Sequence, residues 1–357
     1  MTLLTCRAGL NLPYQLAITL LAASYALSTF FSINMQNSIA ETVKFISFFS
    51  IFFMVSQLDE RQKKLLIDKL VLVAVIISIY AIYQYFWGYQ HTIDYLKKTN
   101  SDFLLTSSYA RDILLARRSI ATFPSPNILG SYLVICFFLS LQLFPSPFPS
   151  PIWGEGRVRG LLKLLPSLLI AIALILTKSM GAWLSLMAAL AILFALSHRS
   201  IKNKKIIIVS LVLIAIVLTF ILITRWDRLT NLENPQNSIT QRLHYWRTAL
   251  AIIKDHALLG VGPGNFHELF LEYSTIPTTG TRYAHNILLH TWAETGILGL
   301  MAIIYLIFNF LRKFKIQSEY KLILLAGFAF ILHNLIDNAY FIPEVSLLWW
   351  VLLALSF

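Results

Sequence analysis

Residues 285–311 read HNILLHTWAETGILGLMAIIYLIFNFL, and this stretch decides the fold class. After its polar start, Glu294 is the only Asp, Glu, Lys or Arg in a run that is otherwise mostly apolar. A bilayer core of about 30 Å needs roughly 20 apolar residues in an α-helix, and this stretch meets that requirement. It therefore predicts a membrane-spanning helix rather than a helix on the surface of a soluble domain.

The rest of the chain has the same character. Of its 357 residues, 57% are hydrophobic and 13% are charged, and the mean hydropathy is +0.69. Soluble domains of this size are less apolar, so we predict an all-α, polytopic membrane helix bundle that forms one integral membrane domain over 1–357. About ten transmembrane helices are expected, at residues 14–33, 42–56, 66–87, 127–144, 161–177, 180–197, 206–224, 285–311, 321–336 and 343–357.

Basic residues indicate the orientation of this bundle. Short cytoplasmic loops are enriched in Lys and Arg, and here these residues follow the second, fourth, sixth and eighth predicted spans. With ten spans, all four loops lie on one side, so both termini are predicted to be cytoplasmic. The long loops 88–126 and 225–284 then face outward, as do Lys178, His285 and Asp337. Because the net charge of +12 lies in membrane loops, it does not indicate nucleic-acid binding.

One segment differs in composition from its surroundings. Residues 145–160, PSPFPSPIWGEGRVRG, are a low-complexity insert in a predicted cytoplasmic loop. The prolines prevent a helix from continuing, so we interpret the insert as a tolerated spacer, although Pro-Ser repeats also suit the docking of a partner.

Cysteine and histidine spacings give no sign of a metal site or of a cofactor. Cys6 lies near the N-terminus and Cys136 lies inside a predicted helix, so a disulfide between them is not expected. Neither CxxC nor HExxH occurs, and the sequence therefore predicts no metal and no cofactor.

The outward loop 225–284 contains a predicted amphipathic helix. Asn237 or Ser238 is a good N-cap, and the helix should run to about His256. Its apolar stripe is expected to lie on the membrane surface or on the bundle. The stripe consists of Leu243, Trp246, Leu250 and Ile253. For Arg247 and Lys254 we favour contact with acidic headgroups, whereas Arg242 is a candidate functional residue.

A glycine-rich turn, GVGPGNF, follows this helix at residues 260–266. Closely spaced glycines, here Gly260, Gly262 and Gly264, allow backbone N–H groups to approach an anion. No strand precedes the turn, which weakens any comparison with nucleotide-binding loops. The alternative is a tight turn that ends one helix and starts another at Asn265.

His285 lies where the same loop re-enters the membrane. An imidazole at this position can exchange a proton near neutral pH, although a histidine at a helix start is also a common capping residue. Asn286 follows it, and Glu294 needs a partner if it is buried. His290 is five residues from His285, so the two should point to different faces and not share a metal.

Several outward bases are expected to surround one cavity. Arginine forks match phosphate oxygens and lysine adds charge, so such a cluster suits a diphosphate. The alternative is that these bases only rim the headgroup zone. The cluster comprises Arg117, Arg118, Lys178, Arg242, Arg282 and His285.

Two stretches together resemble a known family. RTALAIIKDHALLGVGPGNF, residues 247–266, followed by AHNILLHTWAETGILGL, residues 284–300, is similar to the core of the O-antigen ligase and O-antigen polymerase family. The resemblance is clearest over residues 117–300. It implies a multi-pass protein of the bacterial inner membrane that takes glycans from undecaprenyl diphosphate carriers at the periplasmic face, so loops 88–126 and 225–284 would be periplasmic.

The resemblance also implies site residues. The family's arginine before the glycine turn corresponds to Arg242, and its histidine at the next span corresponds to His285; both are implied to be catalytic. The family usually has T-x-S-R-G where this chain has TKSMG from Thr177 to Gly181, so Met180 replaces an arginine and Lys178 is the neighbouring base. The implied diphosphate-binding residues are Arg242, Lys178, Arg118 and Arg117, supported by Gly262, Gly264, Asn286 and Glu294.

The resulting hypothesis is a membrane glycosyltransferase for cell-envelope polysaccharide, acting without a metal. It would transfer a glycan from an undecaprenyl-diphosphate-linked donor to a glycan, lipid or protein acceptor, as in lipopolysaccharide or exopolysaccharide synthesis. One alternative is a polysaccharide polymerase of the same family. Another is a non-catalytic lipid or glycan transporter, although few ionisable groups lie inside the predicted helices. The third is a non-catalytic binding protein, which the loss of an arginine at Met180 favours.

Overall fold

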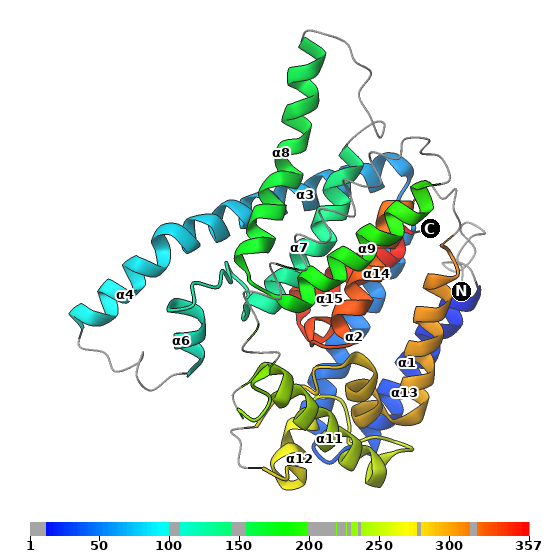
Figure 1. The fold of residues 1–357 in the computed structure, drawn as a ribbon. Helices are drawn as coiled ribbons and strands as arrows, with labels where there is room; N and C mark the ends of the chain where they lie inside the picture. Colours follow the sequence, from blue (N-terminus) through cyan, green and yellow to red (C-terminus); the bar gives the residue numbers. More distant parts are fainter. Residues whose placement is uncertain are drawn as a thin grey trace. The chain divides into compact units, whose positions relative to one another are not determined.

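The computed structural model describes residues 12–99, 108–143, 155–198, 230–234, 237–276, 280–314 and 320–356, and the single positions 219 and 226. All regular structure in this part of the chain is helical, which confirms the all-α class there (Figure 1). The helices are α1 (Leu12–Phe30), α2 (Met35–Ser56), α3 (Glu60–Tyr83), a π-helical turn (Gln84–Gly88), α4 (Tyr89–Lys98), α6 (Ser108–Leu114), α7 (Pro126–Ser140), a 3-10 turn (Leu141–Leu143), α8 (Glu155–Leu176), α9 (Met180–His198), α11 (Ser238–His256), α12 (Phe266–Tyr273), α13 (Ile287–Leu311), α14 (Lys321–Asn334), a 3-10 turn (Ala339–Phe341) and α15 (Pro343–Leu355).

Four of the described helical stretches are long and apolar enough to cross a membrane. They are Met35–Ser56, Glu60–Lys98, Pro126–Leu143 and Ile287–Leu311. Shorter apolar helices lie over 164–176, 180–194, 321–334 and 343–355. The predicted span 206–224 lies outside the described residues, and the number of about ten crossings stays a prediction.

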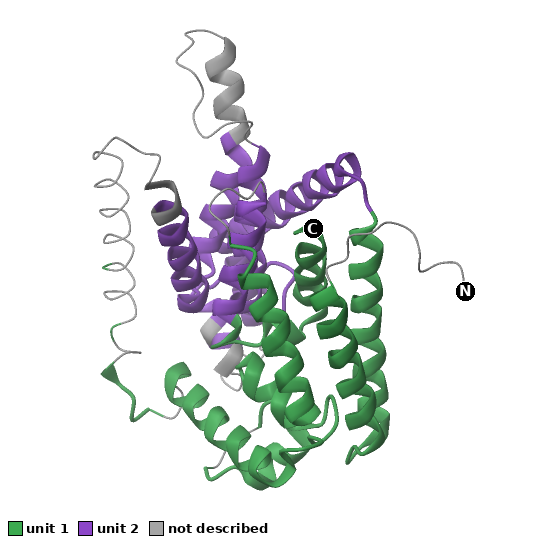
Figure 2. Cartoon of the chain, turned by 90° about the vertical axis from the view of Figure 1, so that its right-hand side faces the viewer, with its two compact units in different colours: residues 1–57, 215–319, 334–357 green, residues 58–214, 320–333 purple. Residues whose placement is uncertain are grey.

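The chain divides into two compact units (Figure 2). Unit 1 comprises residues 1–57, 215–319 and 334–357, and unit 2 comprises residues 58–214 and 320–333. Each unit therefore combines segments that are distant in sequence, and the chain passes between the two units several times.

In unit 1, α13 packs along α1, and α2 packs against α15 and α1. Rings fill the contact between α2 and α15: Phe49 lies 4.8 Å from the ring of Trp350, and Phe52 lies 6.3 Å from it. Helix α2 begins where the Asn34 side chain accepts a hydrogen bond from the Asn37 N–H, a standard N-cap arrangement.

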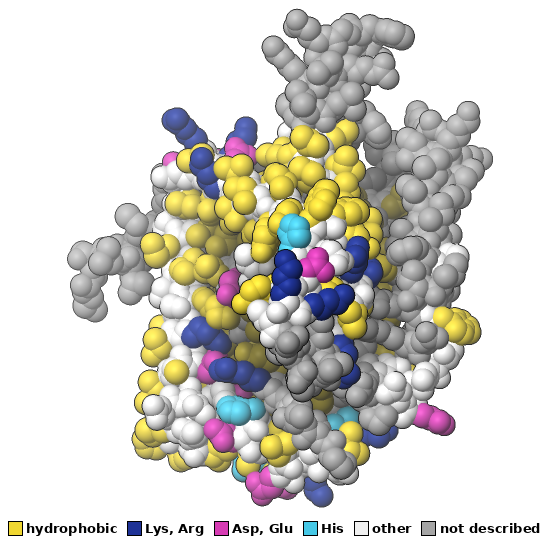
Figure 3. Space-filling view, turned by 90° about the vertical axis from the view of Figure 1, so that its left-hand side faces the viewer, with side chains coloured by type: hydrophobic (Ala, Val, Ile, Leu, Met, Phe, Trp, Pro, Cys, Tyr) yellow, Lys and Arg dark blue, Asp and Glu magenta, His cyan; other side chains and the backbone are white. Residues whose placement is uncertain are grey.

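The free face of α13 is apolar. Its exposed side chains Met301, Ile304, Phe308 and Leu311 are three or four residues apart, so they share one face of the helix. Water would disfavour such a row, whereas lipid tails would cover it. Figure 3 shows, for one side of the molecule, broad hydrophobic areas with charged side chains gathered in separate groups.

In unit 2, α3 packs against α8 and α7, and α7 packs against α9. The last contact is close: a Cβ atom on Gly130 would lie 2.8 Å from the Cβ of Ala182. Helix α3 continues through the π-helical turn into α4, so the predicted outward loop 88–126 begins as a helix. Likewise α8 starts at Glu155, inside the predicted insert 145–160, whose residues up to 154 lie outside the described part.

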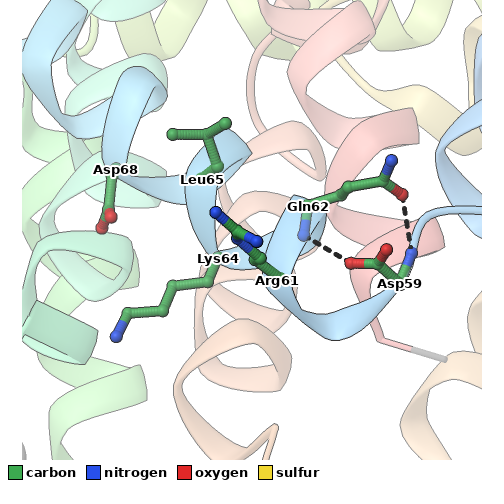
Figure 4. A pocket seen from close by; sticks show the side chains of 6 residues that line it. All are labelled: Asp59, Arg61, Gln62, Lys64, Leu65 and Asp68. Atoms are coloured by element: carbon green, nitrogen blue, oxygen red, sulfur yellow. Dashed lines mark hydrogen bonds between the residues drawn. The ribbon is translucent and has the colours of Figure 1, made fainter.

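A shallow pocket lies at the N-terminus of α3 (Figure 4). The Asp59 side chain accepts from the Gln62 N–H, and the Gln62 side chain accepts from the Asp59 N–H, which together form a capping box. The pocket is lined by Asp59, Arg61, Gln62, Lys64, Leu65 and Asp68, so both signs of charge are present. Its residues belong to the loop that is predicted to be cytoplasmic and to the first turns of α3.

Candidate functional site

Helix α11 carries the candidate residue Arg242, and the bounds of this helix confirm the prediction from the sequence. Asn237 is the N-cap, with its side chain accepting from the Ile239 N–H, and the helix runs from Ser238 to His256. Its buried face does not follow the predicted stripe, because Leu243 and Leu250 are exposed. The residues that pack inward are Ala249, Ile252 and Ile253, which meet Val261, Phe266, Phe270 and Ala293 in one apolar cluster. The cluster fixes α11 and α12 against α13.

Arg242 holds the segment that follows α14. Its Nε donates to the carbonyl of Ile336 at 2.6 Å, and its Nη1 donates to the carbonyl of Ser238 at 3.2 Å. Its Nη2 donates to Oδ2 of Asp337 at 3.0 Å, which makes an ion pair. The arginine side chain is 21% exposed, so a ligand can still reach it.

Asp337 brings the two predicted catalytic residues together. Its side chain is 3% exposed, and its Oδ1 accepts from the Asn338 N–H at 2.9 Å. Nδ1 of His285 lies 3.6 Å from the same Oδ1, within ion-pair distance if the ring is protonated. Arg242 and His285 thus contact opposite oxygens of one carboxylate. The sequence predicted that Asp337 faces outward but assigned it no role. The signal that could have identified it as a site residue was a carboxylate next to an apolar span.

His285 has an unusual backbone. Its φ is +52°, a left-handed conformation that few non-glycine residues adopt. Tyr245 of α11 stacks on its ring at 5.4 Å, and Trp246 Nε1 donates to its carbonyl at 3.4 Å. The next residue, Asn286, is the N-cap of α13 and accepts from the N–H groups of Leu288 and Leu289. Asn286, and not His285, therefore caps helix α13. The ring of His285 faces Asp337 instead.

The glycine turn packs against a break in α13. Gly296 has φ +68° and interrupts this helix, which was predicted as one continuous span. The N–H groups of Val261 and Gly262 donate to the carbonyls of Ala293 and Glu294, just before the break. These donors are therefore engaged by the protein itself. The turn also ends α11 and leads into α12 at Asn265, as the alternative interpretation expected.

Close packing explains the glycines. A Cβ atom on Gly262 would overlap the side chain of Ser32, and one on Gly264 would lie 2.7 Å from Cγ of Glu41. Both glycines also have positive φ, at +96° and +79°. They support the site by bringing the start of α12 against α2.

Glu294 is buried and paired. His290 Nε2 lies 3.4 Å from its Oε2, and the Phe266 N–H donates to its Oε1 at 3.2 Å. Phe266 is the first residue of α12, so the carboxylate lies at a helix N-terminus, where negative charge is favoured. His285 and His290 face different carboxylates, and the described residues contain no group of three potential metal ligands.

Another predicted base, Arg282, is tied to α2. Its Nη2 lies 3.1 Å from Oε1 of Glu41, and Glu41 also pairs with Lys44. Beside it, burial raises the pKa of Tyr283 to about 12, so its hydroxyl stays protonated at neutral pH. Arg282 thus belongs to an ion-paired group of its own in unit 1.

The remaining predicted bases gather in unit 2. Lys178 Nζ donates to the carbonyl of Ala116 at 2.7 Å, and the buried Arg118 donates through Nη2 to Oδ1 of Asn127 at 3.1 Å. Arg117 is exposed. Arg117 and Lys178 both have left-handed φ values, +47° and +51°. Local backbone strain of this kind concentrates at functional sites. Met180 begins α9, directly after these residues.

Comparison with known proteins identifies the region around this site. A family model described as O-antigen ligase matches residues 165–304. An uncharacterised protein of Haemophilus influenzae is 25% identical over 184 residues, which is 45% of this chain and 46% of that protein. The alignment thus spans less than half of the relative. The family match includes Lys178, Arg242, His285 and Glu294, whereas Asp337 lies beyond it. Over residues 165–304, this chain is therefore similar to the O-antigen ligase family.

Proposed function

We propose that this protein is a membrane glycosyltransferase of the O-antigen ligase type. It moves a glycan from an undecaprenyl-diphosphate carrier to an acceptor hydroxyl at the periplasmic face of the bacterial inner membrane, and it uses no metal. The observation that supports this proposal is the convergence of Arg242 and His285 on Asp337. A guanidinium that is hydrogen-bonded to Asp337, with an imidazole 3.6 Å from the same carboxylate, suits a reaction whose leaving group is a diphosphate.

Arg242 stabilises the departing diphosphate. A guanidinium has five N–H donors, and the hydrogen bonds to Ile336, Ser238 and Asp337 use three of them. The others are available to phosphate oxygens. As the bond between the anomeric carbon and the diphosphate oxygen breaks, negative charge develops on that oxygen. A fixed guanidinium stabilises this charge more in the transition state than in the bound donor.

His285 accepts the proton of the acceptor hydroxyl. Asp337 faces Nδ1, which favours a proton on that nitrogen and leaves Nε2 as the base. The acceptor oxygen attacks the anomeric carbon, a new C–O bond forms, and the lipid diphosphate leaves with the electron pair of the old bond. Attack from the opposite side inverts the configuration, and the imidazolium later releases its proton to water.

The bases of unit 2 are proposed to bind the donor diphosphate. Lys178 and Arg117 combine charge with a left-handed backbone, and Arg118 holds the carbonyl and amide groups around them. Gly262, Gly264, Asn286 and Glu294 act indirectly, because they fix the start of α13 and the glycine turn. A lysine lacks the planar fork of the arginine that Met180 replaces, so we expect weaker donor binding than the family motif would give.

Reconstitution tests this proposal. The purified full chain in proteoliposomes, given lipid-linked oligosaccharide and an acceptor, should form a glycosylated product, also in the presence of a metal chelator. Arg242→Ala should lower the rate by about 10² to 10³-fold, as the loss of one oxyanion-stabilising donor does. The exposed Lys98→Ala on α4 serves as a matched control. Full activity of a folded Arg242→Ala protein would contradict the assigned role.

The nature of the product distinguishes the alternatives. A ligase transfers the glycan once to a distinct acceptor, whereas a polymerase extends the lipid-linked chain itself. If the wild-type protein forms neither product but binds the donor, the non-catalytic alternative gains support. In that case Met180→Arg, which restores the family's residue, should produce turnover, and Met180→Leu should not.

A further inference from the structure

The outer face of α11 is an alternating row of leucines and bases. Leu243, Arg247, Leu250 and Lys254 are all exposed. Their spacing of four, three and four residues places them within about 60° of the helix circumference, at roughly 100° per residue. The opposite face, around Ile252, is the buried one. The row therefore points away from the protein.

This row carries positive charge only. Asp255 is the one carboxylate in α11, and it lies about 100° around the helix from Lys254. It also accepts a hydrogen bond from the Tyr273 hydroxyl at 2.8 Å, which directs it toward α12. This row has leucines alternating with bases and contains no acidic residue. Such a row fits the surface of a bilayer, where negatively charged headgroups cover apolar acyl chains.

The end of α11 is hydrogen-bonded to α13 on both sides of its break at Gly296. The carbonyl of Ala257 accepts from the Ile297 N–H at 2.9 Å and from Trp292 Nε1 at 3.1 Å. Ile297 is the first residue after the break in α13, and the exposed apolar row that begins at Met301 follows it. Directly after α11, Leu258 is 75% exposed. The end of α11 is thus next to the part of α13 that carries the exposed apolar row.

We propose that the row Leu243, Arg247, Leu250 and Lys254, called here the basic leucine face, lies on the outward surface of the lipid bilayer. The leucines enter the boundary between headgroups and acyl chains, and the two bases contact the phosphates of acidic lipids. This contact anchors the helix that carries Arg242 at the depth of a lipid-linked substrate. It is independent of whether the protein transfers glycans.

Spin labels on the full chain test the contact. Single cysteines at Leu243 and Leu250, in a Cys6→Ser background that keeps the buried Cys136, are labelled with a nitroxide in phosphatidylglycerol nanodiscs. We expect high accessibility to oxygen and low accessibility to a water-soluble nickel chelate. The control is Glu272→Cys on the exposed surface of α12, which should show the opposite. Equal chelate accessibility at all three positions would overturn the proposal.

Charge variants test the lipid class. Each base near an acidic surface contributes about a fivefold preference for it, so Arg247→Gln with Lys254→Gln should raise chelate accessibility at Leu250 in phosphatidylglycerol toward its value in phosphatidylcholine. No difference between the two lipids would refute the headgroup contact. If the labels are protected only in native membranes and not in pure lipid, a protein covers this face and the proposal is wrong.

Discussion

At the residue scale, three of the predicted bases have an unusual backbone conformation. Among the described residues, four that are not glycine have a positive φ: Arg117, Ala121, Lys178 and His285. Three of them are bases selected from the sequence alone. Such conformations cost about 1–3 kcal/mol and persist only where the surrounding structure holds them. The coincidence of this conformation with predicted bases supports the proposed roles of His285 in unit 1 and of Arg117 and Lys178 in unit 2.

Because of this strain, two substitutions can distinguish the role of the His285 ring from that of its backbone conformation. Asn tolerates the left-handed conformation better than Ala does, so His285→Asn should retain more thermal stability than His285→Ala. Both variants lose the base, and both should lower the transfer rate by about 10² to 10⁴-fold. A chemical role for the ring is contradicted if His285→Asn is stable and fully active.

At the element scale, the break in α13 decides how the outward region is built. A helix interrupted in its apolar part exposes carbonyl groups that lipid cannot satisfy. Here the glycine turn supplies N–H donors to Ala293 and Glu294, and Ala257 accepts from Ile297. After the break, 297–311 extends about 22 Å at 1.5 Å per residue. This is shorter than a bilayer core of about 30 Å, and α13 packs against both α11 and α12.

Substitution of Gly260 tests this arrangement. A methyl group there would overlap the backbone carbonyl of Glu294, and φ is +73°. Gly280 also has a positive φ, +87°, but its Cβ would meet only the Leu271 side chain at 3.5 Å. Gly280→Ala should therefore cost only about 1–2 kcal/mol for the left-handed backbone, and Gly260→Ala clearly more. Thermal unfolding in detergent measures both, and equal losses would contradict a tight contact.

The contact between α11 and the segment after α12 should depend on pH. His244 Nε2 lies 3.0 Å from Ser274 Oγ, and burial followed by the charge of Arg247 lowers the pKa of His244 below its usual 6.5. A lowered pKa means that the folded state favours the neutral ring, so this contribution is complete above the usual pKa and is lost as pH falls through the folded value.

Unfolding temperatures at two pH values check this expectation. Between about pH 8 and about pH 5, the wild-type protein should lose more stability than His244→Gln, which cannot titrate. The difference between the two proteins isolates His244 from other groups that titrate in the same range. An identical pH dependence would show that this ring does not couple protonation to folding.

At the scale of the whole molecule, topology is the first property to test. Both termini are predicted to be cytoplasmic, and loops 88–126 and 225–284 periplasmic, because Lys and Arg occupy alternate loops. Alkaline phosphatase fused after Lys98 should be active, whereas the same enzyme fused after Phe357 should be inactive. If both fusions were active, the number of spans between Lys98 and Phe357 would be even rather than the seven predicted, and the C-terminal end would lie outside.

The sequence by itself determined the helical class, the apolar segments and the limits of α11. These properties follow from local composition and capping, since one run of apolar residues and one Asn at an N-cap suffice to set them. The resemblance to a known family then singled out Arg242 and His285 among the outward bases.

Only the tertiary structure decided which groups meet. Asp337 is distant from Arg242 and His285 in sequence, so no local pattern could show that it contacts both. The break at Gly296 was hidden for the same reason, because it depends on packing between α11, the glycine turn and α13. The sequence also left open whether the stripe of α11 lies on the membrane surface or on the bundle, and the structure leaves Leu243 and Leu250 exposed. Helical periodicity predicts which face of a helix is apolar, but the elements that pack against the helix determine whether this face is buried.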